Sequence, residues 1–445
     1  MKQHDSGDST GDPESETGEI HKLIRKQSNR HQREIFRLRN TVSFRLGKHL
    51  TDAVRQPWRL VFLPVTFPVF AFFLGLERLG KRSQKTIDGL MEESGEPSNC
   101  VVLFPTNGVG FGHFTRMYAL ARRLREVDPT TEIIFFTPMP TLHIPFLDDF
   151  PTYHIAGKYK FKNMSSSQWN GLVEEQLLLI FETHRPKLFF FDGAFPYRGM
   201  LNAISRTQGM KRVWVRRGMF KKGSSIPIDS MAFFDTIVHP GDAIPSEGTD
   251  QVEHQTNVLH VPPILLADTL EKMTRKQARQ RLGVPDEATL WYLQLGAGQI
   301  NDIGSEISLT LKALAEHGEN TYVVVGESLL GQRQEISSPN VRVLRDYPNA
   351  LYFEAFDFAI QAGGYNSFHE MRTSGIPTVF YPNLETGMDD QLARCNVAVE
   401  EGWGIVVGHR NESSIQNAIR SCLELKKSDK PIDNEKTLKW VGNLV

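Results

Sequence analysis

The chain has 445 residues, of which 40% are hydrophobic and 23% are charged, and 51 basic residues balance 52 acidic ones to a net charge of −1. This length allows two or three domains, and the charge balance excludes the overall positive field of a typical nucleic-acid-binding protein. The three cysteines, Cys100, Cys395 and Cys422, are far apart and odd in number, which argues against a disulfide framework and favours a reducing compartment.

The first hundred residues differ in composition from the rest of the chain. Residues 1–19 are rich in Asp, Glu, Ser and Gly with almost nothing apolar, and we expect a disordered acidic tail. From residue 20 the charge reverses. Many basic residues occur up to Arg59, and the only acidic residues among them are Glu34 and Asp52. Apolar residues between 20 and 42 have partial helical spacing, so we expect a basic helix there.

An uncharged stretch of seventeen residues follows at 60–76. As one helix it would span only ~26 Å, against ~30 Å for the hydrocarbon core of a bilayer. Pro64 and Pro68 are also expected to break it. We therefore favour a re-entrant or interfacial insertion, with the neighbouring arginines on anionic lipid, so that residues 20–79 contact a membrane surface. The alternative is an apolar end that packs on the enzyme body or on another subunit.

Two further features complete the description of this N-terminal region. Residues 80–97 are polar and predict a linker, so residues 20–97 form one basic and apolar extension. The N-terminus also lacks a basic segment followed directly by an apolar run and a small-residue cleavage site, so it is not a secretory signal. We expect a cytoplasmic protein, peripheral on the inner face of the cell membrane.

Residues 98–260 predict a first Rossmann-like domain. A buried strand at 101–104 leads to glycines at 108, 110 and 112 and then to a helix. These glycines do not fit the GxGxxG dinucleotide fingerprint. His113 sits where the turn meets the helix, at the carboxyl edge of a parallel sheet, where ligands bind in open α/β sheets. Its imidazole could be a general base for a hydroxyl, or it could be a capping or packing histidine.

More strands alternate with helices through this first half, which implies a parallel sheet. The strands at 187–192 and 211–215 place Asp192, Arg216 and Arg217 at or just past their carboxyl ends. A basic cluster at that edge could hold an anionic acceptor such as a lipid diphosphate. The alternative is a solvated loop.

Residues 261–430 predict a second Rossmann-like domain after a Pro-rich boundary at 260–268. A strand beginning near residue 289 ends in Gly296 and Gly298, a loop that lets backbone approach phosphate. A later strand at 356–361 runs into a Gly-Gly turn at 363–364 and a helix that carries Glu370. Glycines and a helix N-terminus favour a diphosphate, and Glu370 can accept hydrogen bonds from two ribose hydroxyls. The tail, 431–445, predicts a last helix that packs back on the first domain.

These motifs together resemble the glycosyltransferases with two facing Rossmann-like domains, the GT-B fold. The chain is similar to the group typified by the bacterial enzyme that adds N-acetylglucosamine to the lipid-linked muramoyl-peptide precursor, which is family 28-like. The resemblance covers about residues 98–430. Its C-terminal signature is matched by the following residues: Gly363, Gly364, Asn366, Ser367, Glu370, Gly375, Ile376, Pro377, Tyr381, Pro382, Asp390 and Gln391.

The resemblance implies a role for each matched residue. Glu370 would hold the donor ribose, and Asp390 and Gln391 would contact the transferred sugar. The donor diphosphate would be bound by Gly296, Gly298, Gly363, Gly364, Tyr365, Asn366 and Ser367. On the acceptor side, His113 or a carboxylate such as Asp192 would take the proton, beside Gly110, Phe111, Gly112, Arg216 and Arg217.

The implied reaction moves a hexosyl or N-acetylhexosaminyl group from a nucleotide diphosphate sugar, with uridine as the family default, to a hydroxyl of a glycan or lipid-linked acceptor. It inverts the anomeric centre and needs no metal or other cofactor, because helix-end amides neutralise the leaving diphosphate. Relatives of this type take part in bacterial surface-polysaccharide assembly. Two alternatives stay open: a sugar-nucleotide 2-epimerase of the same architecture, and a non-catalytic, membrane-docked partner subunit.

Overall fold

The computed structural model describes residues 41–56, 58–78, 96–106, 110–217, 228–245, 258–296, 303–327, 336, 338–386, 389–427 and 439–443. Two compact units divide the chain, Met1–Glu93 and Ser94–Val445, and each is described by itself. The predicted tail at 1–19, the expected helix up to residue 40 and most of the linker lie outside the described residues. Gly108 and Gly298 lie outside them as well.

The described part of the first unit is a helical hairpin of α2 (Val42–Arg55) and α3 (Trp58–Arg78). Thr41 caps α2, since its side chain accepts a hydrogen bond from Phe44 N at 3.2 Å. The prediction that prolines break the apolar stretch is wrong, because α3 runs unbroken through Pro64 and Pro68. These prolines are four residues apart, so they share one exposed side of the helix, and each removes only one N–H donor. The resulting helix of 21 residues is about 31 Å long.

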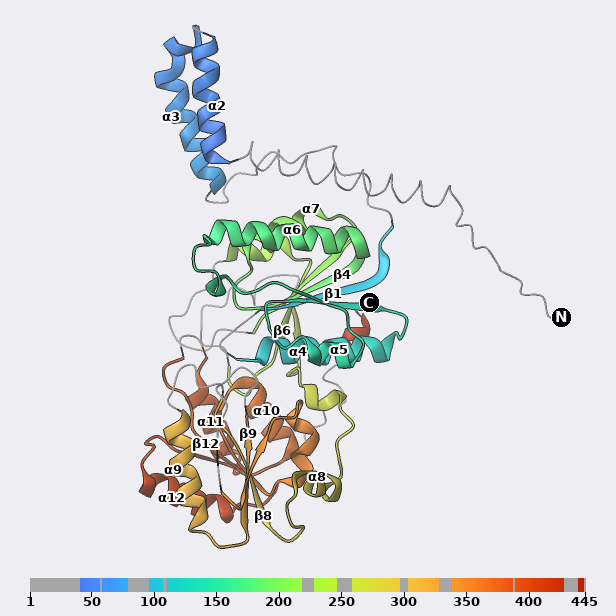
Figure 1. The fold of residues 1–445 in the computed structure, drawn as a ribbon, viewed down its shortest axis with the longest axis vertical. Helices are drawn as coiled ribbons and strands as arrows, with labels where there is room; N and C mark the ends of the chain where they lie inside the picture. Colours follow the sequence, from blue (N-terminus) through green and yellow to red (C-terminus); the bar gives the residue numbers. More distant parts are fainter. Residues whose placement is uncertain are drawn as a thin grey trace, which may run out of the picture. The chain divides into compact units, whose positions relative to one another are not determined.

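The first half of the second unit is a seven-stranded parallel sheet in the order β3-β2-β1-β4-β5-β6-β7. Helices cover both of its faces (Figure 1). The strands are β1 (Ser98–Pro105), β2 (Glu132–Thr137), β3 (Thr152–His154), β4 (Pro186–Asp192), β5 (Lys211–Val215), β6 (Thr236–Pro240) and β7 (Val258–Val261). The covering helices are α4 (Gly112–Val127) and α5 (His143–Leu147) on one face, and α6 (Ser166–His184) and α7 (Arg198–Arg206) on the other.

The central strand β1 explains why helices must cover both faces of this sheet. Val101 and Leu103 point into one core and Val102 and Phe104 into the other, and all four are fully buried. A strand that is apolar on both sides is the pattern of a parallel sheet between two helix layers. The short 3₁₀ helix η6 (Lys439–Asn443) adds Trp440 and Val441 to the core around α4.

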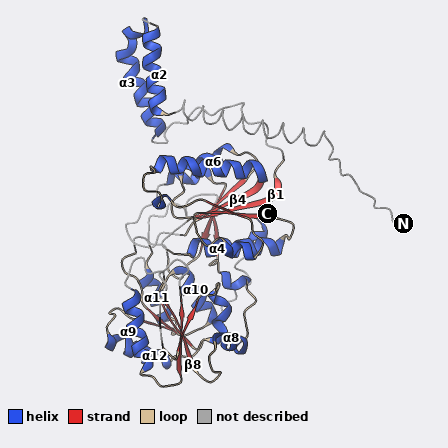
Figure 2. Cartoon of the chain, in the orientation of Figure 1, coloured by secondary structure: helices blue, strands red, loops and turns tan. Residues whose placement is uncertain are grey.

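The second half is a six-stranded parallel sheet in the order β10-β9-β8-β11-β12-β13, again between helices (Figure 2). Its strands are β8 (Thr289–Gln294), β9 (Thr321–Gly326), β10 (Val341–Leu344), β11 (Phe358–Gln361), β12 (Thr378–Phe380) and β13 (Gly404–Val406). One core contains α8 (Arg275–Leu282), α10 (Tyr365–Ser374) and α11 (Gln391–Glu400), and the other contains α9 (Ile303–Ala315) and α12 (Glu412–Leu423).

The strand order of both sheets reverses direction at an inner position. The chain winds outward from β1 to β3 and then restarts at β4, and it winds from β8 to β10 and restarts at β11. Such switch points leave a crevice outside the carboxyl ends of the two strands, where ligands of open α/β sheets bind. The predicted fold class, two Rossmann-like α/β domains behind a helical N-terminal extension, is confirmed.

Candidate functional site

The switch point of the first sheet carries a histidine held by a buried carboxylate. His113, in the first turn of α4, places Nδ1 2.6 Å from Asp192 Oδ1, and Asp192 is the last residue of β4. Arg116, one turn after His113, donates to both oxygens of the same carboxylate, through Nε at 2.8 Å and Nη2 at 2.7 Å. The two predicted catalytic residues therefore lie in direct contact, with an arginine that was not predicted.

The charges in this cluster keep Asp192 ionised beside His113. Burial alone would raise the pKa of Asp192, but Arg116 and His113 outweigh it and hold the pKa below its usual value. Burial alone would lower the pKa of Arg116, but Asp192 outweighs it and the pKa lies above its usual value. Asp192 is thus an acceptor only, and its contact with Nδ1 of His113 requires a hydrogen on that nitrogen, whereas the 2.9 Å contact of Arg116 Nη2 with the same Nδ1 requires a lone pair there.

The side chain of His113 is 25% exposed, whereas that of Asp192 is 1% exposed. The imidazole therefore reaches solvent while its orienting partner stays away from water. This is the geometry of a general base whose ring is fixed by a buried carboxylate.

The switch point of the second sheet carries the predicted glycine turn. Gly363 has φ +63°, and a Cβ there would collide with Cys395 Sγ, so both backbone conformation and space require glycine. Gly364 is the N-cap of α10, and a Cβ at Gly364 would meet no atom within 4 Å. The first turn of α10 therefore begins beside open space, where its N–H groups and positive partial charge favour an anion.

The two switch points face each other. Asn366, in the first turn of α10, donates from Nδ2 to the carbonyl of Gly112 at 3.4 Å. Tyr347 and Thr115 join their hydroxyls at 3.0 Å, and the ring of Phe111 packs edge-on against Tyr347 with centroids 5.1 Å apart. The start of α4, which carries His113, and the start of α10, the helix that carries Glu370, consequently meet at one boundary between the two sheets.

Glu370 is the predicted ribose-binding residue on α10. Its side chain is partly buried, and its carboxylate has no hydrogen bond within the part of the chain that the structure describes. Burial, followed by the nearby charge of Asp268, raises the pKa of Glu370 to about 8, while Lys272 opposes the rise. The ionised form of such a carboxyl is stabilised by hydrogen bonds from neutral hydroxyl donors, and a ribose offers such donors.

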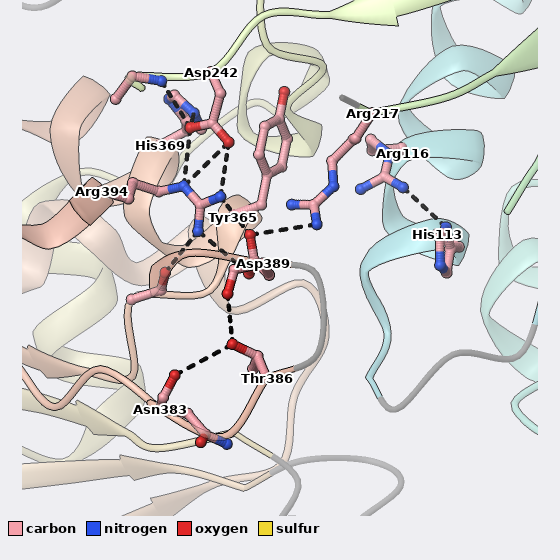
Figure 3. Close-up of polar contacts among 12 residues, drawn as sticks. His113, Arg116, Arg217, Asp242, Tyr365, His369, Asn383, Thr386, Asp389 and Arg394 are labelled. Carbon is pink, nitrogen blue, oxygen red and sulfur yellow. Dashed lines mark hydrogen bonds and ion pairs between the residues drawn. The ribbon is translucent and has the colours of Figure 1, made fainter. Parts of the chain in front are cut away.

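A largely buried ionic cluster joins the two domains at the same boundary (Figure 3). Arg394 of α11 donates to Asp242, which follows β6, through Nε at 2.9 Å and Nη2 at 2.7 Å. The same guanidinium contacts Asp389 Oδ1 at 2.5 Å and the carbonyl of Gly363 at 3.1 Å. His369 Nε2 lies 3.1 Å from Asp242 Oδ1. The Arg394 side chain is 0% exposed, so this cluster is a fixed link between domains.

Tyr365 and Arg217 lie between the ionic cluster and the His113 cluster. Tyr365 is buried and donates its hydroxyl hydrogen to the carbonyl of Gly241 at 2.7 Å, so its side chain joins the domains. Arg217 stacks over the Tyr365 ring at 4.7 Å and places Nη2 3.5 Å from Asp389 Oδ1. Figure 3 shows Arg217 reaching toward Asp389, with Arg116 and His113 on its other side. Arg217 therefore contacts the first residue of α10 and lies on the same side as the His113 cluster.

The remaining predicted residues lie at the same edges but with other contacts. Arg216 is buried with its guanidinium over Trp214 at 5.4 Å. Asp390 caps α11 by accepting from Ala393 N at 3.0 Å. Gln391 Oε1 accepts from Asn383 N at 2.9 Å. Two of the predicted glycines, Gly296 and Gly110, have open space around a hypothetical Cβ, and Gly296 has φ +93°.

Sequence reasoning missed five residues of these clusters: Arg116, Asp242, His369, Asp389 and Arg394. Two of them carried a usable signal. Arg116 lies three residues after His113 and so shares its side of α4, and Asp242 follows a strand at the same sheet edge as Asp192. The other three are recognisable only once the domains are brought together.

No protein-family model matches the sequence, and no curated relative is similar enough in sequence to be matched. Solved structures share the fold. The UDP-GlcNAc 2-epimerase from Methanocaldococcus jannaschii matches with a TM-score of 0.54 at 11% identity, over 78% of this chain and 99% of that one. The Neisseria meningitidis UDP-GlcNAc 2-epimerase gives 0.52 at 12% identity, over 78% and 97%.

A glycosyltransferase is among these structures as well. The spinosyn forosaminyltransferase SpnP matches with a TM-score of 0.50 at 12% identity, over 77% of this chain and 92% of that one. Identities this low show the fold alone. The chain thus has the GT-B architecture that glycosyltransferases and UDP-GlcNAc 2-epimerases share.

Proposed function

We propose that this chain is a glycosyltransferase that moves a hexosyl or N-acetylhexosaminyl group from a nucleotide diphosphate sugar, by family default a UDP-sugar, to an acceptor hydroxyl. The acceptor is a glycan or a lipid-linked sugar. One observation carries the proposal: the buried carboxylate of Asp192 holds His113 at Nδ1, and Asn366 at the start of α10 bonds the neighbouring Gly112, so the imidazole and the α10 N-terminus lie at one boundary. A base on one wall and an anion site on the other are what glycosyl transfer requires.

The chemistry follows from this placement. The acceptor hydroxyl donates its proton to His113 Nε2 while its oxygen attacks the anomeric carbon from the face opposite the diphosphate. The glycosidic bond forms as the bond to the diphosphate oxygen breaks, so the anomeric configuration inverts. Asp192 stabilises the imidazolium that results, without taking the proton itself.

The leaving diphosphate departs toward the first turn of α10. Backbone N–H groups after Gly364 and the guanidinium of Arg217 would stabilise its charge without a metal. Glu370 would hold the ribose, and Asp390 and Gln391 would contact the transferred sugar. Holding both reactants in line can supply ~7–11 kcal/mol of the reduction in barrier.

The test is a pair of substitutions on opposite walls of the crevice. We expect His113→Ala to lower kcat by about 10²–10⁴-fold while the donor dissociation constant stays near normal, because a general base acts only in the transition state. Glu370→Ala should weaken donor binding instead. His143→Ala, at an exposed histidine of the same domain, is the matched control. Unchanged kinetics in both test variants would refute the assignment.

The epimerase alternative is kept because two of the similar structures are UDP-GlcNAc 2-epimerases. Epimerisation breaks a carbon–hydrogen bond of the sugar and needs no acceptor. Sugar nucleotide incubated alone in deuterated buffer would then gain deuterium on the sugar, whereas a transferase gains none and releases nucleotide only with an acceptor. A non-catalytic subunit would bind the nucleotide in calorimetry and turn over under neither condition.

A further inference from the structure

The hairpin of the first unit has an apolar surface that the described part of this unit does not cover. The window 58–76 of α3 has a mean hydropathy of 1.9, and only 6% of it is buried. Its exposed side chains lie all round the helix except along the line that packs on α2. They include Trp58, Leu60, Val61, Phe62, Val65, Val69, Phe72 and Phe73. A soluble helix would confine such residues to one buried face.

The partner helix α2 is amphipathic and basic. It carries the basic residues Arg45, Lys48 and Arg55 against one acidic residue, Asp52. Arg59 follows at the start of α3. Ala53 is buried against the hairpin seam, Lys48 and Arg55 are exposed, and Arg45 lies beside the seam. The hairpin thus has one apolar helix and one helix that carries positive charge along its length.

Specific contacts hold the two helices side by side. His49 of α2 stacks on Phe70 of α3 with centroids 4.8 Å apart, and its Nε2 lies 3.3 Å from Thr66 Oγ1. The guanidinium of Arg45 lies over the Phe70 ring at 5.7 Å. The charges of α2 are therefore fixed alongside the middle of α3, not displaced to its ends.

This pairing decides between two ways of meeting a bilayer. α3 is long enough to cross one, at 21 residues. If the packed pair crossed, Arg45, Lys48 and Asp52 would enter the hydrocarbon core, where each charge is strongly unfavourable. If the pair lies along the surface, α3 enters the acyl region and α2, about 10 Å away, stays at headgroup level.

We propose that the α2–α3 hairpin lies in the plane of an anionic membrane surface, with α3 on the acyl side and α2 on the headgroup side. The lipid surface is what covers the apolar side chains of α3, because the apolar helix fits the acyl region and the basic helix complements anionic headgroups. Both ends of α3 then remain on the same side of the membrane. This inference is independent of the proposed function, because it rests on the hairpin alone.

The first experiment measures binding of the full chain to sedimenting vesicles. Vesicles of phosphatidylcholine with phosphatidylglycerol should bind the chain more tightly than phosphatidylcholine alone. Val61→Asp with Val65→Asp should abolish binding to both, since a charge on α3 cannot enter the acyl region. Lys48→Gln and Arg55→Gln should each weaken binding about fivefold on anionic vesicles only. Val399→Asp, at an exposed valine of α11, should bind as the parent chain does.

The second experiment reports the side on which each end of α3 lies. Arg59→Cys and Gly75→Cys place thiols near the two ends of the helix, and a Cβ at Gly75 meets no atom within 4 Å. The native cysteines Cys100, Cys395 and Cys422 are buried, so a membrane-impermeant maleimide should report the introduced thiols. In inside-out vesicles from expressing cells, both thiols should react.

Three outcomes would overturn the proposal. Protection of one thiol and reaction of the other would mean that α3 spans the membrane. Equal vesicle binding by the double aspartate variant would mean that α3 does not enter lipid. A chain that ignores vesicles but dimerises through the hairpin, with the dimer lost in the same variant by analytical ultracentrifugation, would mean that a second copy covers α3.

Discussion

Two charged clusters lie close together at the boundary between the Rossmann-like domains, and they differ in their access to water. In the first, Asp192 is buried but its partner His113 remains 25% exposed. In the second, Arg394, Asp242 and His369 have exposed fractions of 0%, 1% and 3%, while Asp389 is 17% exposed. The exposed member is therefore an imidazole in the first cluster and a carboxylate paired with Arg394 in the second. The kind of group that is exposed, and not the presence of a buried ion pair, distinguishes the two clusters.

Asp192→Asn tests the first cluster and should have the largest effect on activity. An amide can hold the ring of His113 in either tautomer and cannot stabilise its imidazolium, so kcat should fall by about 10³–10⁴-fold. Donor affinity, measured by calorimetry, should change little. Because Arg116 loses its buried counter-ion, the melting temperature should fall as well, and assays should be done well below it. A loss of donor affinity that matches the loss of kcat would move Asp192 from catalysis to binding.

Arg394→Met tests the ionic cluster that joins Arg394 to Asp242. Removing one partner leaves Asp242 buried without its main counter-charge, so the free energy of unfolding should fall by about 3–5 kcal/mol in urea titrations. Activity per folded molecule should change far less than in Asp192→Asn. The double variant Arg394→Met with Asp242→Leu is the control, and it should recover much of the stability. A normal unfolding curve combined with lost turnover would show that Arg394 has a chemical role.

Donor binding should depend on pH through Glu370, whose raised pKa of about 8 keeps much of it protonated at neutral pH. Ribose hydroxyls favour the ionised form, so donor affinity should rise with pH and level off above 8. At pH 7 we expect it to be about tenfold weaker than the plateau value. Glu370→Gln should bind weakly and without this pH dependence. A flat profile in the parent chain would show that the carboxylate does not bind the donor.

The same raised pKa has a consequence for stability without ligand. The unfolded carboxyl ionises near 4.5, so between that value and about 8 the folded chain binds the extra proton. Stability contributed by this group is therefore present at low pH and is lost as pH rises through that window. Melting temperatures of the parent chain and Glu370→Gln should converge at the acidic end of the window.

The smallest expected effect concerns the neutral contact across the same boundary. Tyr347→Phe removes the hydroxyl that meets Thr115 Oγ1 but keeps the ring packing on Phe111. The unfolding free energy should fall by about 1 kcal/mol, the usual net value of one hydrogen bond. Thr115→Val with Tyr347→Phe should cost little more than the single variant. A larger loss would mean that the aromatic contact itself depends on the hydroxyl pair.

Much of this architecture was predictable from local patterns. Alternating apolar strands and helices predicted both sheets. Because His113 and Asp192 each lie near the carboxyl end of a strand, they were expected at the same sheet edge. The Gly-Gly turn was predicted as a place where backbone N–H groups approach a diphosphate, and the structure adds that Gly363 has a left-handed backbone that favours glycine. The prediction that two prolines would break α3 was wrong. The rule applies to single residues, whereas these two prolines share one exposed side of an otherwise strongly apolar helix.

Periodicity and backbone sterics within a few residues were enough to predict the alternation of strands and helices and the glycine turn at 363–364, but not that α3 runs unbroken through its prolines. Only the tertiary structure decided that His113 bonds Asp192, 79 residues away, and that Arg394 bonds Asp242, 152 residues away. The first pair depends on how α4 packs on its own sheet, and the second on how two separately formed sheets are docked. Each charge is buried beside a counter-charge from a distant segment, and no local pattern encodes that pairing.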